Sequence, residues 1–183
     1  MEVKGLDEKV IKGHNKINEY IRHRPDDDTI ISFTNECENF WKALINSILS
    51  DIDDKTGSIG RLRNREGGHI FFRPVSLLPF VKMVVRIKEK ESVEYSHIIM
   101  MIPEHLRWVQ HRLWRKIIWD NDKKSMIMGN AKLIELLYLY IYDKSMLTSS
   151  ELKKIRTDLV SAWNYHEEDI METLDALIEE DIY

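Results

Sequence analysis

The chain has 183 residues, of which 43% are hydrophobic and 32% are charged, and its formal net charge is −4. This composition excludes a disordered chain, and a chain of this length can bury enough surface to fold without a disulfide or a metal. No apolar run approaches the roughly 20 residues of a membrane-spanning helix, and the start MEVKGLDEK is not a signal peptide. With Cys37 as the single cysteine, we expect a cytoplasmic protein.

The charges are distributed unevenly. Residues 167–183 contain eight of the 31 acidic side chains and no Lys or Arg, so residues 1–166 carry 27 basic against 23 acidic groups. The body of the chain is therefore mildly cationic, which suits an anionic partner and equally lets the acidic tail fold over the basic surface. A solvated helix face is the alternative reading of the tail.

Apolar spacing predicts two helices in the first 50 residues. The first ends near Pro25 and is followed by a loop at Asp26–Asp28; its apolar face is Leu6, Val10, Ile17, Tyr20 and Ile21. Thr34 can cap the second helix, which has the strongest periodic signal in the chain. We expect its apolar face to point at the core: Cys37, Phe40, Trp41, Leu44, Ile45, Ile48 and Leu49.

The middle of the chain begins with an Arg/Gly-rich loop, 51–73, that holds four of the seven glycines and ends in an extended piece, 69–72. Ser76 can cap the next helix, with Pro79 tolerated in its first turn. Its predicted buried stripe is Leu77, Phe80, Val81, Val84, Val85 and Ile87. A further apolar segment, 98–102, is also predicted to be buried.

Turn residues at 120–122 separate two β-rich arms, Leu113–Trp119 and Ser125–Met128. This pattern favours a β-hairpin over 113–128, with a single helix over 104–118 as the alternative.

Three helical patterns complete the chain. Asn130 opens an apolar helix, the stretch Thr148–Glu151 matches a capping box ahead of another, and the acidic segment 167–183 is amphipathic. The predicted fold is mainly α with a small β-hairpin, a single-domain helical bundle covering 1–183.

The stretch 60–85 is the most chemically pointed part of the sequence. Alternating arginines are followed there by two glycines: Arg61, Arg63, Arg65, Gly67 and Gly68. Since no helical spacing runs through them, we expect a loop with exposed guanidinium groups, which with Arg73 can bind phosphate without reading base sequence. The alternative is a solubilising loop that pairs with local acids such as Asp51 and Glu66.

A second cationic cluster interleaves with tryptophans between residues 107 and 119. Such a mixture can stack nucleic-acid bases between cationic side chains. The alternative is that the tryptophans anchor the core while the basic side chains lie over them. The candidate nucleic-acid-binding residues of this cluster are Arg107, Arg112, Arg115 and Lys116.

Neither a metal site nor a known catalytic motif is recognisable. Glu94 and His97 have the E-x-x-H spacing of di-iron bundles, but in one copy only. The stretch Thr56–Arg61 lacks the G-K-[ST] ending of a P-loop, and Cys37 lies on an apolar helix face, where a thiol is inert. We predict no metal, no cofactor and a binding role in preference to catalysis, with an uncatalogued active site left open.

An ordered set of features also resembles a known family. These are Phe40-Trp41 in a helix, an arginine-rich turn, the stretch IFFRPVSLLPFVKMV, Trp114 and Trp119 in the hairpin, and an apolar helix. This order, over roughly residues 33–142, resembles the C-terminal part of bacterial DGQHR-motif proteins, which include DndB-type proteins associated with DNA phosphorothioation. The DGQHR signature, which in that family lies in an N-terminal domain similar to ParB and sulfiredoxin, is absent from this sequence. The resemblance implies a helical accessory region, and no catalytic residue carries over.

The predicted function is a non-catalytic accessory module of a bacterial DNA-modification or phage-defence system that binds DNA or RNA. The alternative is a protein-interaction subunit that docks through its acidic tail and a Met/Trp-rich surface: Met100, Met101, Trp108, Met126 and Met128. A contiguous exposed apolar patch would favour the alternative, because monomers seldom expose large apolar areas. Cations converging on one face would favour nucleic-acid binding.

Overall fold

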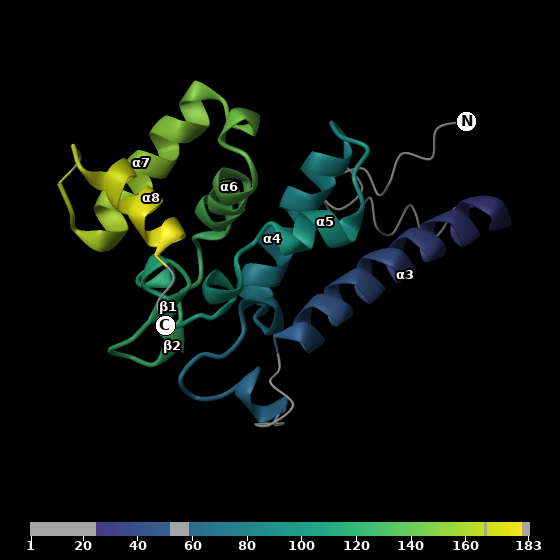
Figure 1. Cartoon of the computed structure of the whole chain (residues 1–183), viewed down its shortest axis with the longest axis horizontal. Coiled ribbons are helices and arrows are strands. Elements are labelled where there is room, and N and C mark those ends of the chain that lie inside the picture. Colours follow the sequence, from purple (N-terminus) through teal and green to yellow (C-terminus); the bar gives the residue numbers. More distant parts are fainter. Residues whose placement is uncertain (1–24, 52–58, 167, 181–183) are drawn as a thin grey trace. The chain divides into compact units, whose positions relative to one another are not determined.

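The computed structural model of the chain describes residues 25–51, 59–166 and 168–180 (Figure 1). Within these ranges it contains six α-helices and one two-stranded antiparallel hairpin, which confirms a mainly α fold with a small β element. The chain divides into two compact units, residues 1–46 and 47–183. A single domain over 1–183 therefore stays a prediction. None of the described helices combines the length and apolar character needed to cross a membrane.

Helix α3 spans Asp27–Ser50, so the predicted loop at Asp26–Asp28 is wrong. The Asp26 carboxylate accepts a hydrogen bond from the Thr29 backbone N–H (2.8 Å) and caps the helix, and two further acids occupy its first turn, where the helix dipole favours negative charge. Thr34 is not the cap, because its hydroxyl donates to the Ile30 carbonyl inside the helix. The helix predicted over residues 6–21 lies outside the described residues.

The apolar face of α3 is only partly buried. Leu44 and Ile48 are buried, whereas Trp41, Ile45 and Leu49 are each about half exposed. Ile45 and Leu49 are one residue further round the helix than the buried pair, so their side chains leave the buried stripe. The prediction that the whole apolar face points at the core is wrong for these three positions.

Helix α4 spans Pro74–Lys88 and begins three residues earlier than Ser76 would place it. Pro74 at the first position suits a helix start, because its fixed backbone angle is already helical. Pro79 consequently lies in the second turn, where the N–H it lacks removes one helical hydrogen bond. Ser76 is buried and pairs with the Tyr138 hydroxyl instead of capping.

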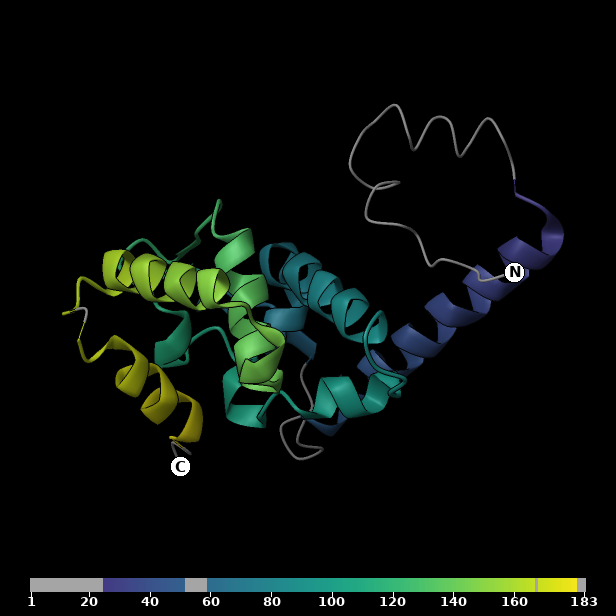
Figure 2. The ribbon, with the colours of Figure 1, turned by 90° about the horizontal axis from the view of Figure 1, so that it is seen from above.

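Packing of α4 against α6 (Ala131–Tyr142) forms the core of residues 47–183, and Figure 2 shows α6 between α4 and α7 (Ser149–Trp163). An aromatic cluster joins α4, α6 and two 3-10 turns, Ile70–Phe72 and Arg112–Trp114. Its ring centroids are 4.5–5.5 Å apart, in tilted or edge-on pairs: Phe71, Phe80, Tyr138 and Trp114. Such pairs add about 1 kcal/mol each to the burial of apolar area.

The hairpin is present but shorter than predicted. Strand β1 is Trp119–Asp120 and β2 is Ser125–Met126, paired antiparallel with Trp119 opposite Met126. Most of the predicted first arm is instead the 3-10 turn Arg112–Trp114 followed by further turns. In the piece predicted as extended, 69–72, His69 is extended and pairs with Trp108, but Ile70–Phe72 is a 3-10 turn. The apolar residues of both segments are mostly buried, a pattern that strands and 3-10 turns share.

One helix that the sequence did not predict follows α4. Helix α5 spans Tyr95–Met100. In the segment 98–102, predicted to be buried, the three isoleucines are buried, but Met100 and Met101 are exposed, so the prediction is wrong for these two positions. The 3-10 turns Glu104–Arg107 and Lys144–Met146 connect later elements. Helix α7 begins with the predicted capping box, and α8, Ile170–Glu179, packs against α7.

An ion pair joins α4 to the start of α7. Both terminal nitrogens of Arg86 donate to the Glu151 carboxylate, at 2.6 and 2.9 Å. Glu151 also accepts from the Thr148 backbone N–H. The Arg86 guanidinium in particular, with Thr148 and against the opposing effect of burial, lowers the pKa of Glu151 from 4.5 to about 2.

We predict that Glu151→Gln loses about 2 kcal/mol of stability at pH 7 and almost nothing at pH values near 2. The folded-state pKa lies below the unfolded value, so the contribution of Glu151 is complete above about pH 4.5 and disappears as the pH falls towards 2. Urea unfolding between these pH values measures it, with Glu104→Gln on the exposed surface as control. A difference that does not vary with pH would contradict the prediction.

Candidate functional site

The arginine loop, residues 59–73, is shaped by tight backbone contacts. It opens with the 3-10 turn Ile59–Arg61 and continues through the buried Leu62, whose carbonyl accepts from the His69 N–H (2.9 Å). Gly68 has φ +89°, and a Cβ there would lie 2.5 Å from the Leu62 carbonyl oxygen. Only glycine allows the backbone at position 68 to lie this close to the Leu62 carbonyl, so the predicted bend at the glycines is confirmed for Gly68.

Arg73 closes this loop from the inside. Its Nε donates to the Gly67 carbonyl (2.8 Å) and one terminal nitrogen to the Asn64 carbonyl (2.8 Å). The Asn64 side chain adds bonds to the Arg61 carbonyl and the Glu66 N–H. Arg73 is half-buried, and its guanidinium lies 6.0 Å from the centre of the Trp119 ring. Its first role is to fix the loop.

The three other loop arginines lie outside this closure. Arg61, Arg63 and Arg65 are all exposed, as predicted. Burial and the nearby charge of Arg63 lower the pKa of Arg73, so these two cations are close in space. The part of the predicted loop at 52–58 lies outside the described residues.

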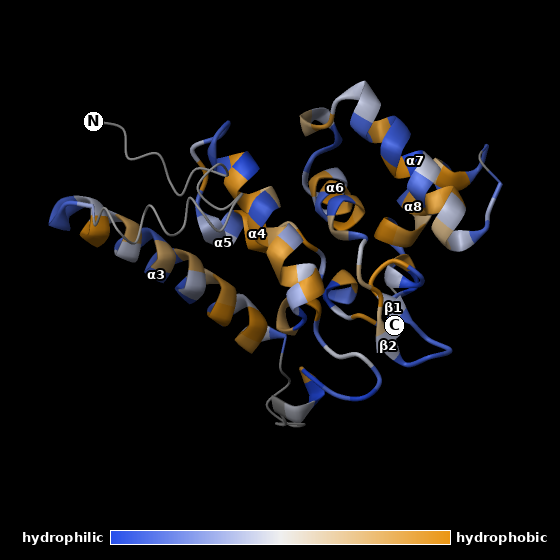
Figure 3. Ribbon diagram, turned by 180° about the vertical axis from the view of Figure 1, so that it is seen from behind, coloured by the Kyte–Doolittle hydropathy of each residue, from blue (hydrophilic) through white to orange (hydrophobic). Residues whose placement is uncertain are grey.

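The loop meets the hairpin around a hollow of about 540 Å³. The residues that line it are Asn64, Arg65, Glu66, Arg73, Trp119, Lys124, Ser125 and Met126. The loop and the hairpin turn are both strongly hydrophilic (Figure 3). Lys124 Nζ lies 2.6 Å from a Glu66 carboxylate oxygen, and both side chains are about 60% exposed (59% and 62%). Three cations therefore share one hollow with a single carboxylate.

Lys124 has an unusual backbone conformation. Its φ is +48°, in the left-handed region that favours glycine or asparagine. It is the last residue before β2, after a turn in which the Asp120 carboxylate accepts from the Asp122 and Lys123 N–H groups. Lys116 shares this conformation, with φ +58°, but its ammonium group pairs with two aspartates, whereas Lys124 lines the hollow.

The second cationic cluster is dispersed. Arg112 is exposed and faces Glu180 at 3.4 Å, so the acidic tail does fold over part of the basic surface. Lys116 lies 3.3 Å from Asp120 and 3.0 Å from Asp122. Arg115 is exposed, and its carbonyl accepts from the Trp163 indole. These three residues do not line the hollow.

Arg107 is buried, with 6% of its surface exposed, so its prediction as a nucleic-acid contact is wrong. Its Nη1 donates to both Asp51 oxygens, at 2.8 and 2.9 Å, and to the Ser47 hydroxyl (2.9 Å). The Asp51 carboxylate also accepts from His69 Nε2 (3.1 Å). Burial alone would raise the pKa of Asp51, but the hydrogen bonds from His69 and Arg107 outweigh it and lower the pKa.

We predict that Arg107→Met costs about 3 to 5 kcal/mol of stability, because it leaves the Asp51 carboxylate buried without its partner. The exposed Arg115→Met should change stability by less than about 0.5 kcal/mol. Urea unfolding of both variants at pH 7 makes the comparison. Equal stability of the two variants would show that the buried ion pair of Arg107 and Asp51 does not stabilise the fold.

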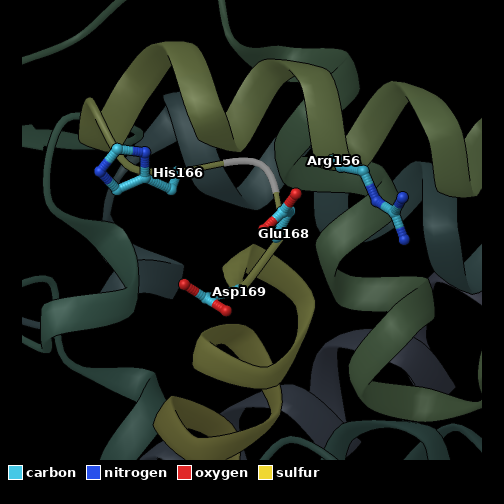
Figure 4. A pocket seen from close by; sticks show the side chains of 4 residues that line it. All are labelled: Arg156, His166, Glu168 and Asp169. Carbon is cyan, nitrogen blue, oxygen red and sulfur yellow. The ribbon is translucent and has the colours of Figure 1, made fainter.

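A second hollow, of about 480 Å³, lies where α7 gives way to α8. It is lined by Arg156, His166, Glu168 and Asp169, whose side chains point in different directions and do not converge on one point (Figure 4). The lining combines one arginine and one histidine with two carboxylates, so it favours neither an anionic nor a cationic ligand.

Two histidine rings lie close together beside helix α8. His105 and His111 have ring centroids 5.3 Å apart, and His105 Nε2 contacts the Ile178 carbonyl. Burial, with the charges of His105 and Arg112, lowers the pKa of His111 to about 4. Among the residues that the structure describes, no three His, Cys, Asp or Glu side chains are grouped to hold a metal.

No protein-family model, curated protein or solved structure matches the chain. The resemblance to DGQHR-motif proteins therefore stays a prediction.

Glu66 was predicted from the sequence as a possible partner of the loop, but Lys124 and its ion pair with Glu66 were missed. They are 58 residues apart, and no local pattern links them. The dipeptide Lys123-Lys124 after the Asp-Asn-Asp turn was an available signal of exposed charge.

Proposed function

We propose that the chain is a non-catalytic nucleic-acid-binding module that contacts backbone phosphates through the arginine loop and the hairpin. The observation that supports this most is the hollow in which Arg65, Arg73 and Lys124, from two separate segments, come together. Arg61 and Arg63 extend the cationic surface along the loop. We propose from the family resemblance alone that this module belongs to a bacterial DNA-modification or phage-defence system.

The chemistry of the loop suits phosphate. Arginine guanidinium groups bind phosphate oxygens through paired, charge-assisted hydrogen bonds. Since Arg73 holds the loop closed, less conformational freedom is lost when a phosphate binds. Such contacts give affinity that falls with salt and reads no base sequence.

The proposal is narrower than the predicted set of eight residues. Arg107 is buried, Arg112 faces Glu180, and Lys116 is paired with two aspartates, so these three contribute little to an outward cationic surface. Arg115 is exposed but does not line the hollow. Of the eight residues, the four that belong to the arginine loop stay in the proposal, and Lys124 joins them: Arg61, Arg63, Arg65 and Arg73.

The protein-docking alternative has weaker support. Met100 and Met128 are strongly exposed, at 71% and 76%, and Met101 at 41%. However, Met100 and Met101 lie at the end of α5, whereas Met128 follows strand β2. Helix α5 and the hairpin lie apart in Figure 1. The exposed thioethers therefore do not form the contiguous patch that a docking surface needs.

We expect the triple change of Arg61, Arg63 and Arg65 to alanine to weaken binding of labelled DNA and RNA. The plot of log affinity against log salt, from about 50 to about 200 mM, should become shallower by about 2 to 3, because each lost duplex phosphate contact removes about 0.9 from the slope. Fluorescence anisotropy measures both quantities.

A matched control removes three cations elsewhere: Lys153, Lys154 and Arg156, all exposed on α7, changed to alanine. This variant has the same net charge as the loop variant but should keep most of the affinity. Absence of binding by the unmodified chain at low salt, or equal losses in the two triple variants, would falsify the proposal.

Lys124→Gly separates a functional role from a structural one. Glycine accepts the left-handed conformation of Lys124, so the free energy of unfolding should stay the same or rise by up to about 1 kcal/mol. Affinity for nucleic acid should nevertheless fall, because the charge is lost. Chemical unfolding and anisotropy on the same sample test this, and unchanged affinity would remove Lys124 from the interface.

A further inference from the structure

We infer that Glu66 acts as an intramolecular stand-in for phosphate: its carboxylate occupies Lys124 in the unbound protein, and a backbone phosphate displaces it from the hollow. This inference rests on the proposed function and names the group that the hollow receives. Its basis is the 2.6 Å contact between Lys124 Nζ and Glu66 Oε1 at the meeting of loop and hairpin.

The ion pair can be exchanged at small cost. Both side chains are more than half exposed, and exposed ion pairs contribute only about 0 to 1 kcal/mol in water. A phosphate in the hollow meets Lys124 together with Arg65 and Arg73, so it replaces one carboxylate contact with contacts to several cations.

The loop does not need the Glu66 carboxylate for its shape. Closure comes from Arg73 and the Asn64 side chain, and the Glu66 contribution to it is its backbone N–H, which donates to Asn64 Oδ1 (2.8 Å). The carboxylate can therefore move away from Lys124 while the loop keeps its conformation.

The hollow suits the nucleic-acid backbone and not the bases. Trp119, its aromatic residue, is only 5% exposed, and the Arg73 guanidinium lies over its ring. A base therefore finds no open aromatic face on which to stack, which is how single-strand binders hold bases. We expect affinity to vary little with base sequence at equal length and strandedness.

Glu66→Gln tests the inference, because a residue that competes with the ligand gives tighter binding when it is neutralised. We expect affinity for a labelled duplex to rise about tenfold or less, with unchanged thermal unfolding. The matched control is Asp158→Asn on α7, which makes the same charge change and releases Lys154 from a similar surface pair (2.8 Å). The control should change affinity by less than twofold.

A double-variant cycle identifies Lys124 as the group that Glu66 blocks. Most of the gain from Glu66→Gln should disappear when Lys124 is alanine, since displacement then frees no cation and only the repulsion between carboxylate and phosphate is removed. A gain of equal size in the Lys124→Ala background, or one that equals the Asp158→Asn effect, overturns the inference while leaving the proposed function intact. Loss of all binding by the unmodified chain overturns the proposed function itself.

Discussion

The buried contact of Arg107 with Asp51 is the constraint on which the geometry of residues 47–183 depends. A charge inside a protein is tolerated only with a partner, so Asp51 fixes Arg107 from the 3-10 turn before Trp108 and His69 at the end of the arginine loop. The main chain continues this connection, since Val109 N–H donates to the Gly68 carbonyl (2.9 Å). These contacts fix the buried end of the arginine loop, while Arg61, Arg63 and Arg65 remain exposed.

Two arginines that line the hollow differ in what their guanidinium groups contact. Arg73 uses its guanidinium to bind carbonyl groups and fix the loop, whereas Arg65 carries its charge into the hollow. The division follows from burial: a half-buried guanidinium must find acceptors nearby, and an exposed one is satisfied by water until a ligand replaces it. Arg73 thus holds the backbone of the loop in place, while the water around the exposed Arg65 can be exchanged for another acceptor.

Some local signals in the sequence were confirmed, others such as the caps at Thr34 and Ser76 were wrong, and pairings between distant residues were not predicted. The capping box of α7 and the mainly α fold follow from residues within a few positions of one another. The burial of Arg107 depends on Asp51, 56 residues away, and Lys124 meets Glu66 across 58. The start of α3 was missed for another reason, because three consecutive aspartates indicate a loop and a capped helix start equally well.

The methionines are divided between two environments, and this affects how the chain tolerates oxidants. Met83 is fully buried between helices, while Met100 and Met128 extend into solvent. Conversion of a thioether to a sulfoxide adds a polar oxygen, which disrupts a packed interior but costs little at a wetted surface. An oxidant in solution therefore reaches Met100 and Met128 before Met83, and their oxidation leaves the packed interior intact.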